Sequence, residues 1–130
     1  MAPESPLPVP TDAEIELLTV LWRLGPSTVR EAFEALQPKK AIGYTTVLKQ
    51  LQVMHRKGLV RRSERFRAHV YEPNESRDRT RRHLVRSLLN QVFDGSARSL
   101  IHSALAGRRI SAEELAEIRE ILVEVEKGKK

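Results

Sequence analysis

Residues 43–73, with the sequence GYTTVLKQLQVMHRKGLVRRSERFRAHVYEP, decide the fold of this chain. A helix is predicted over 44–57, because apolar residues recur at helical spacing along one side and Gly58 supplies the left-handed residue that commonly ends a helix. Two strand-forming segments, 59–64 and 68–72, then predict a β-hairpin. This order is typical of a winged helix-turn-helix, in which the helix enters the major groove of DNA and the hairpin forms the wing.

Two further helices are expected before this stretch. The segments 11–14 (TDAE) and 28–31 (TVRE) both have the capping-box pattern, in which a threonine hydroxyl and a glutamate carboxylate each bond the other residue's backbone amide. The first helix should end at Gly25-Pro26 and the second before Pro38. Residues 1–10 contain four prolines and predict a disordered leader.

After the hairpin, residues 76–130 predict helical segments that are interrupted at Gly95 and Gly107, the last of them opening at a third capping box, 111–114 (SAEE). Each segment has an apolar stripe, and about 50 residues are too few to bury all of these stripes internally. We therefore expect them to pack against a second copy of the chain. The expected dimerisation residues are Leu88, Leu89, Val92, Phe93, Leu100, Ile101, Leu105, Leu115, Ile118 and Leu122.

The expected fold class is mainly α with a small β-hairpin. Three parts are expected along the chain: the leader over 1–10, a winged helix-turn-helix DNA-binding domain over 11–75, and a C-terminal helical dimerisation region over 76–130.

The net charge of +6 is concentrated in one stretch of the chain. Residues 41–90 carry a net charge of +8, whereas 1–40 carry −2 and 91–130 carry 0. Nucleic acid is held first through its phosphates, so this stretch is a candidate DNA-binding face, although any single residue in it could equally be a solvated surface charge. The candidate contacts are Thr45, Thr46, Lys49, Gln52 and Arg56 on the exposed face of the 44–57 helix, and Arg62, Arg65 and Arg67 on the hairpin. The short β-branched side chains of Thr45 and Thr46 suit close approach to phosphate oxygens and thymine methyls, and Lys49 can reach a guanine edge or a phosphate.

Several other chemistries are excluded or unsupported. The chain has no cysteine, which excludes disulfides, thiolate zinc sites, iron-sulfur clusters and a cysteine nucleophile. The four histidines form no pair at i, i+3 or i+4, and there is neither a glycine-rich phosphate loop nor a nucleophile elbow, so we expect no metal, no cofactor and no enzyme activity. No apolar run approaches the ~20 residues of a membrane span, and no signal peptide is evident, so a cytoplasmic protein without membrane insertion is expected.

A family resemblance rests on five short motifs that together cover nearly everything after the leader. They are Leu21-Trp22, Thr28-Val29-Arg30-Glu31, Gly43-Tyr44-Thr45-Thr46-Val47-Leu48, Lys57-Gly58-Leu59-Val60 and Val70-Tyr71-Glu72-Pro73. With them the chain resembles the penicillinase repressor (BlaI/MecI) family. The resemblance implies a dimeric winged-helix repressor that binds a palindromic operator, and it adds Thr28, Arg30 and Tyr44 to the expected DNA contacts. It also implies release from DNA by a protease antirepressor or, in a copper-responsive branch, by metal.

The chain departs from the family pattern at three places. Phe66 stands at the wing tip, where the family usually has a glycine. Ser103-Ala104 stand where penicillin-responsive members carry an asparagine-hydrophobic cleavage pair, and the paired cysteines of the copper branch are absent. We therefore expect that the chain is either cleaved elsewhere or released without a cut between Ser103 and Ala104.

Two functional hypotheses follow. The leading one is a homodimeric, sequence-specific transcriptional repressor of an antibiotic- or stress-response operon. The alternative is a basic helical module that binds RNA or a protein partner. Readers of single-stranded RNA stack bases on exposed aromatic side chains, and only 5% of this chain is aromatic, with Phe66 as the one candidate for such a platform.

Overall fold

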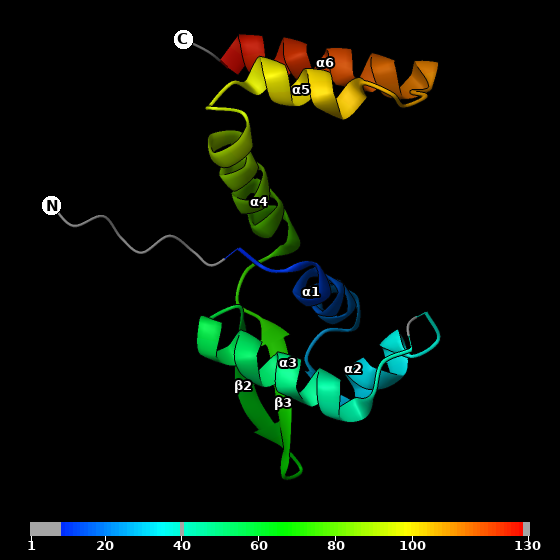
Figure 1. The fold of residues 1–130 in the computed structure, drawn as a ribbon, viewed down its shortest axis with the longest axis vertical. Helices are drawn as coiled ribbons and strands as arrows, with labels where there is room; N and C mark the ends of the chain where they lie inside the picture. Colours follow the sequence, from blue (N-terminus) through cyan, green and yellow to red (C-terminus); the bar gives the residue numbers. More distant parts are fainter. Residues whose placement is uncertain (1–8, 40, 129–130) are drawn as a thin grey trace, which may run out of the picture. The chain divides into compact units, whose positions relative to one another are not determined.

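The computed structural model of the chain describes residues 9–39 and 41–128 (Figure 1). Residues 1–8, which make up most of the predicted leader, lie outside the described residues. The chain forms two compact units, the first extending to Ser87 and the second beginning at Leu88. The elements in order are α1 (Asp12–Leu24), β1 (Ser27–Thr28), α2 (Val29–Leu36), α3 (Tyr44–Lys57), β2 (Val60–Arg65), β3 (Ala68–Pro73), α4 (Arg77–Val92), α5 (Ala97–Leu105) and α6 (Ala112–Gly128).

The first unit contains three helices and a three-stranded antiparallel sheet in the order β1-β3-β2. The predicted hairpin of β2 and β3 is confirmed, with Val60 opposite Pro73 at one end and Arg65 opposite Ala68 at the other. The third strand, β1, was not expected. Its two residues pair with Val70 and Tyr71 of β3, so they form a strand only because the folded chain brings β3 beside them.

Local hydrogen bonds fix the starts of the helices. Both predicted capping boxes in the first unit form. The Thr11 amide donates to the Glu14 carboxylate at 2.9 Å, and the Glu14 amide donates to the Thr11 hydroxyl at 3.2 Å. The same two bonds join Thr28 and Glu31 at 2.9 and 3.1 Å. The third box forms its hydroxyl half, since the Glu114 amide donates to Ser111 Oγ at 3.0 Å. Gly58 ends α3 with φ of +86°, as predicted.

Apolar side chains from all three helices and the hairpin form the core of the first unit. Helix α3 buries the predicted stripe of Val47, Leu51 and Met54, each fully inaccessible to solvent. Helix α1 buries Leu17, Leu18, Val20 and Leu21, whereas Leu24 at its end is largely exposed. The core leaves the other side of α3 free for solvent or a ligand.

One ion pair ties the start of α1 to the end of α3. Lys57 Nζ donates to both carboxylate oxygens of the buried Glu14 at 2.8 and 3.0 Å, across 43 positions of sequence. Burial acts to raise the pKa of Glu14, but the bonds from Lys57 and Thr11 and the charge of Lys57 outweigh burial and hold that pKa below its ordinary value.

The substitution Glu14→Gln is expected to lower the free energy of unfolding at neutral pH by about 1–3 kcal/mol, because it removes a charged partner from a nearly buried site. A carboxyl whose pKa is lowered by folding stabilises the fold above the ordinary pKa of glutamate, and that contribution disappears as the pH falls through the folded pKa. The loss should therefore shrink on acidification. Urea titrations at several pH values measure it, with Glu34→Gln as the exposed control; an equal loss at all pH values would contradict the assignment.

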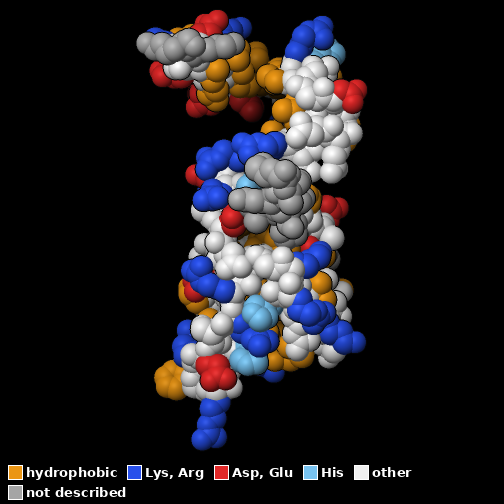
Figure 2. Space-filling model, turned by 90° about the vertical axis from the view of Figure 1, so that its left-hand side faces the viewer, with side chains coloured by type: hydrophobic (Ala, Val, Ile, Leu, Met, Phe, Trp, Pro, Cys, Tyr) orange, Lys and Arg blue, Asp and Glu red, His pale blue; other side chains and the backbone are white. Residues whose placement is uncertain are grey.

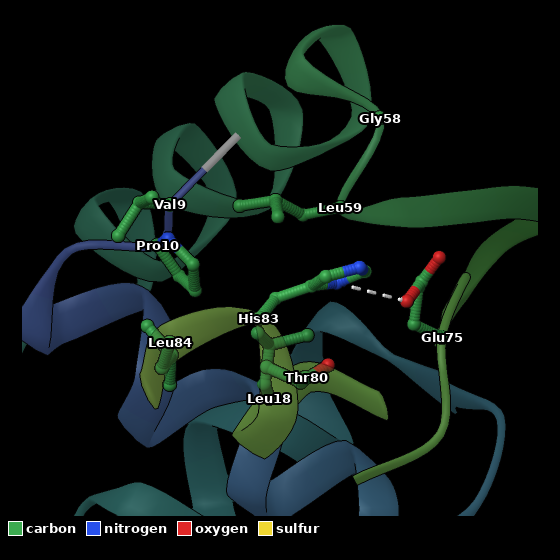
Figure 3. A pocket seen from close by; sticks show the side chains of 9 residues that line it. All are labelled: Val9, Pro10, Leu18, Gly58, Leu59, Glu75, Thr80, His83 and Leu84. Atoms are coloured by element: carbon green, nitrogen blue, oxygen red, sulfur yellow. Dashed lines mark ion pairs between the residues drawn. The ribbon is translucent and has the colours of Figure 1, made fainter. Parts of the chain in front are cut away.

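A small cavity lies where α4 begins (Figure 3). Val9, Leu18, Leu59 and Leu84 form its apolar walls, and Pro10 closes it. Its volume of about 30 Å³ accommodates water but no drug-sized ligand, whose sites are roughly ten times larger. We assign it to the packing of the first half of α4 within the first unit. The segment before α4 is held there as well, because the Trp22 indole N–H donates to the Glu75 carbonyl at 3.0 Å.

The second unit is helical, and within its described residues no side chain is buried. Apolar side chains are instead widely exposed along the end of α4 and on α5 and α6: Leu88, Val92, Ile101, Ile121, Leu122, Val123 and Val125. Over the described part of the chain, every helix is too short or too polar to cross a bilayer.

Candidate nucleic-acid interface

Helix α3 presents opposite faces to the core and to solvent. Thr45, Thr46, Lys49, Gln52 and Arg56 are all exposed, as the sequence predicted. The helix begins at Gly43, which has no side chain to cap it, so the amides of the first turn remain available beside the two threonine hydroxyls. Amides at a helix start favour anions, and the threonines add donors at the same place. This face can therefore hold phosphate at its start and reach base edges further along.

The junction between α2 and α3 brings together two further predicted contacts. The guanidinium carbon of Arg30 lies 5.3 Å from the centroid of the Tyr44 ring, a cation-π distance. Phe33 also packs on the Tyr44 ring, in an edge-on contact with centroids 5.8 Å apart. Thr28 has a different environment: it is half-buried, and its hydroxyl already accepts the Glu31 amide as the helix cap.

The arginines of the hairpin fall into two groups. Arg61 is paired with Glu72 at 3.0 Å and Arg65 with Glu31 at 3.1 Å. Arg62 and Arg67 are exposed, and the described residues provide neither with an ion-pair partner. The free guanidinium groups of Arg62 and Arg67 are therefore the more available for phosphate.

The pair between Arg65 and Glu31 also joins the hairpin to α2, across 34 positions of sequence. The pKa of Glu31 lies below its ordinary value, chiefly because its carboxylate accepts the Thr28 amide and also because Arg65 lies beside it. Glu31 thus acts at once as helix cap and as anchor for the wing. The capping-box pattern predicted the first role, whereas the pairing with Arg65 was not evident from the sequence.

The wing turns through two residues, Phe66 and Arg67, since Arg65 pairs directly with Ala68. Both have positive φ, +51° and +67°, which is the conformation of a type I′ hairpin turn. The Phe66 side chain is 95% exposed. Side chains of Lys and Arg recur over the part of the first unit that holds α3 and the hairpin (Figure 2).

Sequence reasoning left out one basic segment at the start of α4. Arg77, Arg82 and Arg86 are exposed there and have no ion-pair partner among the described residues, while Arg79 pairs with Glu75 and Arg81 with Asp78. The charge count over 41–90 contained the signal, because these arginines contribute to the net charge of +8. They extend the positive field of the first unit beyond the wing.

Three helices, a β-hairpin and an exposed basic third helix define the first unit as a winged helix-turn-helix domain. The sequence profile of the penicillinase repressor family matches residues 10–124. The chain belongs to the penicillinase repressor family, which consists of transcriptional repressors and not of enzymes.

Individual relatives agree with this membership. The transcriptional regulator BlaI of Mycobacterium tuberculosis (strain H37Rv) is 36% identical over 120 residues, covering 90% of this chain and 85% of that protein. The penicillinase repressor of Bacillus licheniformis is 27% identical over 124 residues, covering 95% and 97%. The solution structure of monomeric Bacillus licheniformis BlaI in complex with the blaP half-operator superposes with a TM-score of 0.50 at 25% identity, covering 55% of this chain and 88% of that one.

Proposed function

We propose that this chain acts as a homodimeric transcriptional repressor that binds a duplex operator with two-fold symmetry. The observation that carries the proposal is the exposed face of α3, with Lys49 and Arg56, together with a wing whose Arg62 and Arg67 have no ion-pair partner among the described residues. In this arrangement α3 enters the major groove and the wing contacts the neighbouring backbone. The complex of the Bacillus licheniformis relative with its half-operator supports the binding of operator DNA.

The exposed apolar surface of the second unit supports dimerisation. Of the residues expected at the interface, Leu88, Val92, Ile101 and Leu122 are exposed, and the others are half-buried. Soluble proteins rarely leave so many large apolar side chains in water unless they cover an interface. A second copy would cover the same surface on both chains and would present two α3 helices to an inverted repeat.

Duplex-specific binding distinguishes this proposal from an RNA-binding module. The full chain is incubated with a randomised duplex library, and the enriched duplex is compared with single-stranded RNA of the same length in gel shifts at matched salt. We expect binding to the enriched duplex that survives excess unrelated DNA. Preference for the RNA, or complete loss with competitor, would favour the alternative.

Lys49 and Arg62 are expected to contribute in different ways. Lys49→Ala should weaken binding to the enriched duplex by about 1–3 kcal/mol with little effect on unrelated DNA, because a base-edge contact is specific. Arg62→Ala should weaken binding to all duplexes and reduce the salt slope by about one unit, because a phosphate contact does not depend on the base sequence. Titrations of both duplexes at several salt concentrations measure this. If Lys49→Ala loses equal affinity for the enriched and the unrelated duplex, Lys49 contacts a phosphate and not a base edge.

The protease antirepressor belongs to the proposal only through the family resemblance. Ser103 and Ala104 are exposed, but both are helical residues of α5. A protease that binds its substrate in an extended conformation could reach the bond between them only after the helix unwinds locally. The described structure thus offers no ready cleavage loop at this position. We infer that release from DNA proceeds without this cut.

A further inference from the structure

Phe66 is the most exposed large hydrophobic side chain among the described residues, at 95%. It lies at the tip of the wing, at the first position of the two-residue turn between β2 and β3. No packing against the described part of the chain accounts for an aromatic ring at this place. Burial therefore gives no reason for Phe66.

The backbone of the turn gives no reason for it either. Phe66 and Arg67 both adopt positive φ, which glycine and asparagine accept readily and a bulky side chain does not. A turn of this type is best made by Asn-Gly. An aromatic side chain at this position is unfavourable for the backbone of the turn and exposes apolar surface to water. We therefore look for its role in a contact that the wing makes with another molecule.

The charges around Phe66 indicate what that contact is. Arg67 follows it in the turn, Arg62 lies further along β2, and neither has an ion-pair partner in the described structure. An apolar ring next to Arg67 in the turn, with Arg62 on the same hairpin and neither arginine ion-paired within the described residues, fits a surface that is polyanionic at its edges and apolar inside. The minor groove of duplex DNA has this character, because phosphates line its walls, and apolar side chains enter it between base steps.

We propose that Phe66 is an apolar wedge that enters the minor groove beside the site read by α3, while Arg67 contacts the adjoining phosphates. The inference rests on the proposed binding of duplex DNA but not on dimerisation. When α3 lies in the major groove, a wing that follows it in sequence and space meets the next minor groove. The ring would partly unstack one base step there and favour steps that deform easily.

The substitution Phe66→Asn separates the folding role from the binding role. Asparagine relieves the turn, so the thermal midpoint should rise or stay constant, while affinity for the enriched duplex should fall by about tenfold. Phe66→Leu keeps an apolar side chain and should lose only about twofold. The matched control Arg67→Gly relieves the second turn position, keeps Phe66, and should mainly reduce the salt slope. Because Phe66→Asn should keep or raise the thermal midpoint, a fall in its affinity cannot be explained by unfolding.

A spectroscopic readout locates the contact. The enriched duplex carries 2-aminopurine at successive positions flanking each copy of the motif, and its fluorescence should rise at one step beside each copy when the full chain binds, but not when Phe66→Asn binds. Unchanged affinity for Phe66→Asn, or a loss seen only with single-stranded DNA, would overturn the wedge while leaving the repressor proposal intact. If the unsubstituted chain enriches no duplex, both are overturned.

Discussion

A fragment of residues 1–87 should remain folded and sediment as a monomer. It should bind the operator about 10²- to 10⁴-fold more weakly than the full chain, because the DNA-binding domains of two protomers are no longer linked. The cut belongs after Ser87, where the first compact unit ends. An earlier cut would remove Glu75, whose carbonyl accepts the Trp22 indole, and Leu84, which lines the cavity beside Leu18. Gel shifts and sedimentation of fragment and full chain measure both quantities.

A substitution in the full chain controls for effects of truncation. Leu122→Glu places a charge on the exposed apolar surface of α6 and should reproduce both the monomer and the weaker binding. The matched control Glu113→Gln changes an exposed residue in the first turn of α6, eight positions before Ile121, and should retain the dimer and the affinity. If the fragment sediments as a dimer, the interface is misassigned. If the full chain sediments as a monomer and still binds the operator far more tightly than the fragment, the linkage of two chains is not the source of that affinity.

The substitution Leu51→Ala should lower the free energy of unfolding by about 3–5 kcal/mol, because it leaves a cavity at a fully buried position. Domains of this size are stable by only about 5–15 kcal/mol, so this loss is a large fraction of the total and should lower the thermal midpoint by roughly 10 °C or more. Leu48→Ala, on the same helix but only partly buried, should cost clearly less. Urea unfolding followed by circular dichroism measures both.

The two leucine variants also separate folding from recognition. Where Leu51→Ala remains folded, at low temperature, it should keep its preference for the enriched duplex, since Leu51 faces away from Lys49 and Gln52. A cost below about 1 kcal/mol would mean that α3 is not held by this core as described.

Features encoded by neighbouring residues could be predicted from the sequence. The capping boxes at Thr11 and Thr28 and the glycine end of α3 at Gly58 depend on contacts within a few positions, and all are present. The polar face of α3 also follows directly from helical spacing. The winged helix-turn-helix was predictable because its signals are of this local kind.

Features that depend on distant residues were not predictable. The strand β1 exists only because β3 lies beside Ser27 and Thr28. The pairs Glu14–Lys57 and Glu31–Arg65 join residues 43 and 34 positions apart, and a carboxylate in a capping box gives no sign of a second partner. The sequence placed Arg61, Arg62, Arg65 and Arg67 together on the wing, whereas only the fold separates the paired guanidinium groups from the free ones.

The sequences that the full chain enriches from a random duplex library test the central claim most directly. A homodimer that reads DNA through two α3 helices should enrich two inverted copies of one short motif, with centres a whole number of helical turns apart, about 10 or 20 base pairs. Enrichment of a single unrepeated motif, or of no sequence at all, would contradict the proposal that this protein is a dimeric reader of a symmetric operator.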